Sequence, residues 1–136
     1  MYRFAEKNID SLIHSGAMNI IKINDFQPIL DRISENFNIV TRGNYDEIWI
    51  QLMKKDPDFF IQDQMGWLQS INCIDTYPCY LIINDSSDRV VYKIFRAEDL
   101  EHLLNETIGF VYYLCSENID RIIFFNSYDT LAVFKA

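Results

Sequence analysis

The stretch that decides the fold is residues 110–134, FVYYLCSENIDRIIFFNSYDTLAVF. Three runs of apolar, β-branched and aromatic residues lie within it: 110–115, 122–126 and 130–134. Such runs are typical of strands, and the connections between them, 116–120 and 127–129, are short enough for hairpins. The stretch therefore predicts three consecutive antiparallel strands.

A further strand pair and a helix precede this stretch. Cys79–Asn84 and Val90–Phe95 have strand character, and the polar turn 85–88 separates them, which is a hairpin signal. Ala97–Glu106 has the helical period instead. Its apolar positions, expected to face inward, are Ala97, Leu100, Leu103 and Leu104. Its acidic positions, expected to face water, are Glu98, Asp99, Glu101 and Glu106. The order ββαβββ predicts one antiparallel sheet of about five strands.

The N-terminal half reads as mostly helical. Residues 2–15 form a first amphipathic segment that Gly16 can stop. A second helix begins near Pro28, with Asn24 or Asp25 as its cap, and a third spans 44–55. Residues 18–23 are either a short strand or an extended lead-in, and the ambiguous stretch 59–72 is interpreted as a short helix around 65–71. We therefore expect an α+β fold whose N-terminal helices pack on a C-terminal sheet.

Large residues alternate on both faces of the predicted strands, as in 110–115 and 122–125. One face would take the N-terminal helices, and the other would take the helix 97–106 and leave aromatic surface open. Such an open aromatic face would be a partner site. The alternative is a sheet whose two faces are both fully covered.

Composition predicts a single packed domain over residues 1–136, since 49% of the residues are hydrophobic and only 4 are glycine and 3 proline. Acidic residues outnumber basic ones 20 to 12, for a net charge of −8. We find no cluster of Lys and Arg of the kind that phosphate backbones require, so nucleic acid is an unsuitable partner. A negative field favours a basic partner; alternatively, the charge only maintains solubility.

Three cysteines, Cys73, Cys79 and Cys115, are an odd number without paired spacing. This indicates reduced thiols rather than a secreted disulfide framework. The N-terminus has no apolar signal core, and the longest apolar run, 109–115, is far too short to cross a membrane. We expect a cytoplasmic protein with no membrane association.

Candidate catalytic residues are few, and each has a plainer interpretation. Cys115 follows an apolar strand and could serve as a nucleophile, although a cysteine in that setting is usually core. His102 shares a helical face with Glu98 and Glu106, which suits either a metal or general base, or a solvated surface. We find no zinc pairs, calcium loop, phosphate loop or hydrolase motif, so we predict no cofactor, no metal and no enzymatic activity.

Acidic residues are concentrated in the C-terminal half, with nine acids against four bases over residues 85–129. They can be interpreted as an electrostatic docking surface that captures a basic partner. They can equally be ordinary solvated loops and helix faces.

The C-terminal half resembles a group of small bacterial proteins, some of which look like immunity proteins encoded beside polymorphic toxins. The resemblance rests on a helix followed by Phe110-Val-Tyr-Tyr-Leu114, then Ile122-Ile-Phe124, then Asn126-Ser-Tyr-Asp-Thr-Leu131. That group often has a tryptophan where Arg121 stands and a histidine pair where Ser127-Tyr128 stands. A role of those histidines therefore does not carry over to this chain.

The resemblance implies an immunity or inhibitor protein that neutralises a basic toxin domain, possibly a nuclease, by occlusion and without chemistry of its own. The partner-binding residues under this hypothesis are Asp85, Asp88, Glu98, Asp99, Glu101, Glu117, Asp120, Tyr128 and Asp129. Carboxylates would pair with Lys or Arg, and Tyr128 would anchor. The alternatives are a regulatory or scaffold module that binds a host protein or its own copy, and a small enzyme that uses Cys115 or His102. The sequence leaves the oligomeric state open.

Overall fold

The computed structural model describes residues 4–16, 18–39, 45–63, 66–74, 76–83, 90–106, 111–125 and 130–136. Within these ranges the helices are α1 (Phe4–His14), α2 (Gln27–Phe37), α3 (Tyr45–Leu52), α4 (Gly66–Cys73) and α5 (Ala97–Glu106). The strands are β1 (Ile20–Ile23), β2 (Phe59–Gln62), β3 (Cys79–Ile83), β4 (Val90–Ile94), β5 (Tyr112–Ser116), β6 (Arg121–Phe125) and β7 (Thr130–Lys135).

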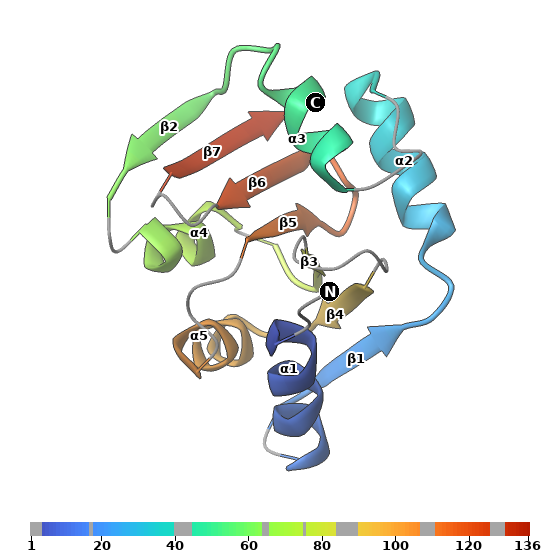
Figure 1. The fold of residues 1–136 in the computed structure, drawn as a ribbon, viewed down its shortest axis with the longest axis vertical. Helices are drawn as coiled ribbons and strands as arrows, with labels where there is room; N and C mark the ends of the chain where they lie inside the picture. Colours follow the sequence, from blue (N-terminus) through green and yellow to red (C-terminus); the bar gives the residue numbers. More distant parts are fainter. Residues whose placement is uncertain are drawn as a thin grey trace.

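The described strands form one antiparallel sheet in the order β1-β4-β3-β5-β6-β7-β2, which runs from lower right to upper left in Figure 1. The α+β class, the ββαβββ order of the C-terminal half and the hairpins within it are confirmed. The predicted strand number of about five is too low, because β1 and β2 add a strand at each edge. Residues 18–23 thus contain a strand, and the stretch 59–72 contains a strand as well as the expected helix.

The helices cover both faces of the sheet. Helices α1, α4 and α5 share a core with one set of strand side chains, among them Leu81, Leu114 and Val133. Helices α2 and α3 share the opposite core with the alternate set, among them Ile82, Tyr113 and Ala132. The prediction that the N-terminal helices occupy one face together is therefore wrong. They divide, because the apolar stripes of α1 and α4 pack beside α5 and those of α2 and α3 pack on the other side.

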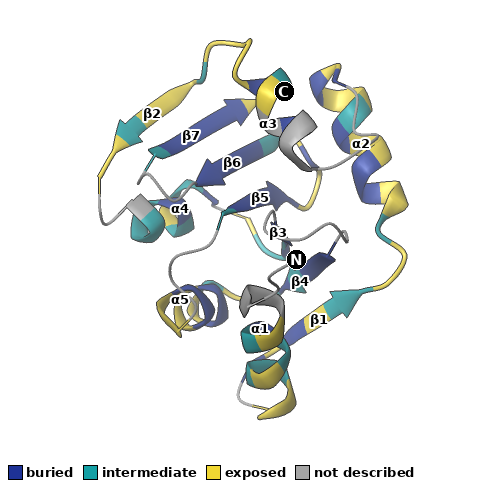
Figure 2. Ribbon diagram, in the orientation of Figure 1, coloured by how far each residue is buried: buried dark blue, intermediate teal, exposed yellow. Residues whose placement is uncertain are grey.

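The aromatic residues of the central strands are buried rather than open to a partner. Tyr112, Tyr113, Phe124 and Phe125 are at most 7% exposed, and β5 and β6 are almost uniformly dark blue in Figure 2. Tyr113 lies across from Phe124 with their ring centroids 4.9 Å apart, and Tyr112 lies across from Phe125 at 5.6 Å. The covered sheet is the correct interpretation for the described residues, since two helical layers bury what one layer would have left exposed.

Local signals at the helix ends are partly confirmed. Gly16 follows α1 with φ +75°, as expected of a helix stop. Asn38 ends α2 in the left-handed conformation that asparagine tolerates. The predicted cap at Asn24 or Asp25 is wrong, because α2 begins after Phe26, which makes no side-chain cap and packs against the core.

Candidate partner-binding site

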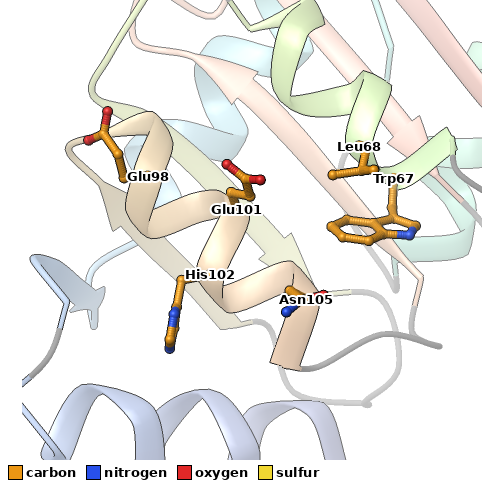
Figure 3. Close-up of a pocket in the computed structure, with 6 residues that line it drawn as sticks. All are labelled: Trp67, Leu68, Glu98, Glu101, His102 and Asn105. Atoms are coloured by element: carbon orange, nitrogen blue, oxygen red, sulfur yellow. The ribbon is translucent and has the colours of Figure 1, made fainter.

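A surface hollow lies between α4 and α5, on the outer side of the layer formed by α1, α4 and α5. It is lined by Trp67 and Leu68 from α4 and by Glu98, Glu101, His102 and Asn105 from α5. Its volume is about 520 Å³, within the range of roughly 300–1,000 Å³ of pockets that hold small molecules. Figure 3 shows the indole of Trp67 and the side chain of Leu68 on one side and the four α5 side chains on the other.

Helical spacing brings the four α5 residues to this surface. Glu98 and Glu101 are three residues apart, and His102 and Asn105 each lie one turn further on, so all four belong to adjoining rows of the helix. All four are exposed, because α5 buries its other side through Leu100, Leu103 and Leu104. In Figure 3 the imidazole of His102 extends away from the two carboxylates. Of the two carboxylates, that of Glu101 extends toward Leu68 and Trp67, whereas that of Glu98 lies at the end of α5 far from the indole.

Helix α4 is fixed to the sheet by polar contacts close to Trp67. The hydroxyl of Ser70 donates to the carbonyl of Trp67 at 2.6 Å and lies 2.8 Å from the phenol oxygen of Tyr112, in a buried setting. The guanidinium of Arg121 donates to the carbonyl of Cys73, at the last turn of α4. Arg121 thus satisfies a helix C-terminus. These bonds fasten the backbone of α4, which carries Trp67, to the sheet.

Asp99 does not belong to the open surface, which corrects the prediction that it faces water. It is only 4% exposed. Its carboxylate pairs with Arg96, with one nitrogen–oxygen distance of 3.1 Å, and accepts the backbone N–H of Asn19 at 3.2 Å. The helical period put Asp99 on the outer side, but the chain segment that leads into β1 covers it. Because Asp99 neutralises Arg96, the charge beside the hollow is set by Glu98 and Glu101.

The other predicted residues do not gather around the hollow. Glu117 and Asp120 are exposed in the turn between β5 and β6. Arg32 of α2 donates to the backbone carbonyls of Glu117 and Asn118, at 3.3 and 2.8 Å, so this turn is held to the opposite helical layer. The predicted acidic surface is thus divided between two parts of the molecule. Asp85, Asp88, Tyr128 and Asp129 lie outside the described residues.

Trp67, Leu68 and Asn105 are the residues that sequence reasoning missed. Trp67 and Leu68 are both half-buried, and Trp67 also packs against the core under α1, α4 and α5. The available signal was weak: a tryptophan in a short helix, and a strongly acidic helix further along the chain with two strands between them. Only the tertiary packing of α4 beside α5 joins the two.

The alternative catalytic candidates find little support. Cys115 is fully buried, and burial raises the pKa of its thiol far above the usual range, so it lacks both the access and the thiolate that a nucleophile needs. Burial likewise raises the pKa of Cys79 to about 12. In the part of the chain that the structure describes, no group of three or more His, Cys, Asp or Glu side chains is arranged to hold a metal.

Comparison with known proteins yields no match: no family model fits this sequence, and no curated protein or solved structure is significantly similar to it. The resemblance to immunity-like proteins stays a prediction. None of the described helices has the length and apolar character needed to span a bilayer.

Proposed function

We propose that this chain is an inhibitor of the immunity type, which binds a basic protein partner through the hollow between α4 and α5 and blocks that partner by occlusion. The observation that carries the proposal is that the Trp67 indole and the carboxylates of Glu98 and Glu101 line one hollow, on a chain of net charge −8. The expected partner is a cognate toxin domain, for which a basic nuclease is the best chemical fit.

The hollow suits the long basic side chain of a partner. A guanidinium or ammonium group can lie against an indole face and gain a cation–π contact. The carboxylates can accept its N–H groups in charge-assisted hydrogen bonds. Leu68 offers an apolar surface for the aliphatic stem of the same side chain. Arginine fits better than lysine, because its planar group both stacks and forms two parallel hydrogen bonds.

The occlusion mechanism needs no reactive group on this chain. Acidic residues steer a basic partner into encounter, and a buried anchor then slows its dissociation. An inhibitor bound in this way covers the partner's groove and excludes its substrate. Under this proposal the hollow supplies the anchor, and the acidic field of the whole chain supplies the steering.

The test is to capture the partner from native cells with the tagged chain at low and high salt, then to purify that partner and titrate it calorimetrically. The expected partner is stoichiometric and basic, loses its activity when bound, and binds more weakly as salt rises. Trp67→Ala should weaken binding by about 30-fold, the effect of a typical hot spot. Glu98→Gln with Glu101→Gln should weaken it and flatten its salt dependence.

The matched control is Glu35→Gln. Glu35 is an exposed acid on α2, on the opposite side of the sheet. Glu35→Gln makes the net charge of −8 less negative by one without touching the hollow, so it should change affinity little. If Trp67→Ala and Glu35→Gln have the same effect, or if the partner keeps its activity when bound, the proposal is wrong.

A further inference from the structure

We propose that the β2 edge of the sheet pairs with the β2 edge of a second copy of this chain, so that two sheets join into one across a twofold axis at Phe60. This inference is independent of the proposed function, because β2 lies at the far edge of the sheet and lines no part of the hollow. Figure 1 shows β2 at the upper left, with β7 as its described neighbour.

Within the described part of the chain, β2 is an edge strand that pairs with β7 on one side. It reads FFIQ and carries no charge, and Phe59 and Phe60 are 42% and 50% exposed. Most of it is drawn as exposed in Figure 2, beside the buried strand β7. Sheets usually protect their edges with charged residues, proline or a covering segment. The opposite edge, β1, follows that rule, since Lys22 lies within it and pairs with Asp10 at 3.0 Å.

The pairing with β7 shows which face of the sheet each β2 side chain is on. Phe60 lies across from Ala132, which belongs to the core under α2 and α3. Phe59 and Ile61 lie across from Val133 and Leu131, which belong to the core under α1, α4 and α5. The edge strand therefore carries an apolar side chain on both faces of the sheet.

Charge favours a second copy over a basic partner here. Among the described residues, the exposed charged side chains that lie next to β2 in the chain or on its neighbour β7 are Lys54, Lys55, Lys135, Asp56, Asp58 and Asp63. They balance to zero, three against three, on a chain whose net charge is −8. A neutral patch does not attract a basic protein. It can approach its own copy without local repulsion.

Strand geometry then fixes the register. Residues that lie opposite each other in an antiparallel pair point to the same face of the sheet. The twofold axis must therefore lie midway between one residue and the same residue of the second copy. With the axis at Phe60, each Phe60 lies across from Phe60 of the second copy on one face. On the other face Phe59 lies across from Ile61 of the second copy. This register aligns apolar side chains with apolar side chains at all three positions.

The dimer should be weak. Its apolar contact is limited to a four-residue strand, so the area is below the roughly 1,200 Å² of stable interfaces. A dissociation constant on the order of 10–100 µM follows for such a contact. Salt should strengthen it or leave it unchanged, because salt screens the repulsion between two acidic chains. Binding of the basic partner should respond to salt in the opposite direction.

Sedimentation velocity of the full chain over this concentration range tests the inference. The wild type should shift from monomer to dimer, Phe60→Lys should stay monomeric, and Ile21→Lys should behave as the wild type. Ile21 is the matched control, since it is an apolar residue with 52% exposure on the other edge strand. A monomeric wild type, a dimeric Phe60→Lys or a monomeric Ile21→Lys would each overturn the proposal.

A cross-link keeps the test decisive if Phe60→Lys fails to fold. Phe60→Cys in a Cys73→Ser background, treated with oxidised glutathione, should form a disulfide between two copies. Residues opposite each other in antiparallel strands have Cα atoms about 4.5–5.5 Å apart, which suits a disulfide. Phe59→Cys in the same background should cross-link far less, because its counterpart is Ile61. Equal cross-linking at both positions would exclude the axis at Phe60.

Discussion

At the scale of single residues, two tyrosines differ in one hydrogen bond. The phenol of Tyr112 lies 2.8 Å from the hydroxyl of Ser70. The phenol oxygen of Tyr77 is buried and has no hydrogen-bond partner among the described residues. Burial raises the pKa of both phenols. A buried polar group stabilises a fold only when it is paired.

Removal of the phenol oxygen should therefore change the free energy of unfolding differently at the two positions. Tyr112→Phe should lower the free energy of unfolding by about 1 kcal/mol, whereas Tyr77→Phe should leave it unchanged or raise it. Urea unfolding of the two variants and the wild type measures both. A loss at Tyr77 equal to that at Tyr112 would show that the Tyr77 phenol has a partner.

The buried thiols predict instability in alkali. The pKa of Cys79 is about 12 in the fold against 9.0 for an ordinary thiol. Above pH 9 the unfolded chain releases this proton while the folded chain retains it, so stability is full below pH 9 and is lost as pH rises toward 12. Cys115 acts in the same direction.

Each thiol should remove about 1.4 kcal/mol of stability per pH unit in this window. Thermal unfolding at pH 8, 9 and 10 should show the decline, and Cys79→Ala with Cys115→Ala should decline less steeply. Parallel curves for the two proteins would refute the assignment.

The burial or exposure of a side chain was predictable from the sequence where it depended on the local period of a strand or helix. The burial of Cys115 and the exposure of Glu98 and Glu101 follow from strand and helix periods. The burial of Asp99 could not be predicted in this way, because its partner Asn19 is 80 residues away in the chain. The hollow itself needed the packing of α4 on α5, which no spacing in the sequence encodes.

At the scale of elements, dependence on tertiary packing also explains why the sequence did not place the two edge strands in the sheet. The C-terminal hairpins were predictable because each strand pairs with a neighbour in the sequence. Strands β1 and β2 have four residues each and pair with β4 and β7, about 70 residues further on. A short apolar run far from its partner carries no hairpin signal. Its place in the sheet is set by tertiary packing.

At this scale the prediction concerns Asp58, which fastens the start of β2 to β7 through two hydrogen bonds. Its N–H donates to the carbonyl of Val133 at 2.8 Å, and its carboxylate accepts the N–H of Lys135 at 2.7 Å. Asp58→Ala loses the second bond, so opening of this edge should become about five- to tenfold more frequent.

Hydrogen exchange at low protein concentration should show this as faster exchange in β2 and at Lys135, with β3 unchanged. Asp56→Ala, at an exposed neighbouring position, is the control and should leave exchange as in the wild type. Equal acceleration across the whole sheet would mean that Asp58 stabilises the fold globally rather than the edge.

At the scale of the whole molecule, the sheet is shared by two cores. Leu114 points into the core under α1, α4 and α5, whereas its neighbours Tyr113 and Cys115 point into the core under α2 and α3. Neither core can lose its strands without exposing the other. The described parts of the chain should therefore unfold as one cooperative unit.

Two matched substitutions test this cooperativity. Ile9 of α1 is 0% exposed and Ile33 of α2 is 1% exposed, one in each core. Ile→Val at either position removes one methyl group and should cost about 0.5–1.5 kcal/mol. Both variants should shift a single transition, and far-UV circular dichroism and tryptophan fluorescence should report the same midpoint. If Ile33→Val instead splits the two midpoints while Ile9→Val does not, the layer of α2 and α3 unfolds by itself. The sheet would then keep its structure under α1, α4 and α5 alone.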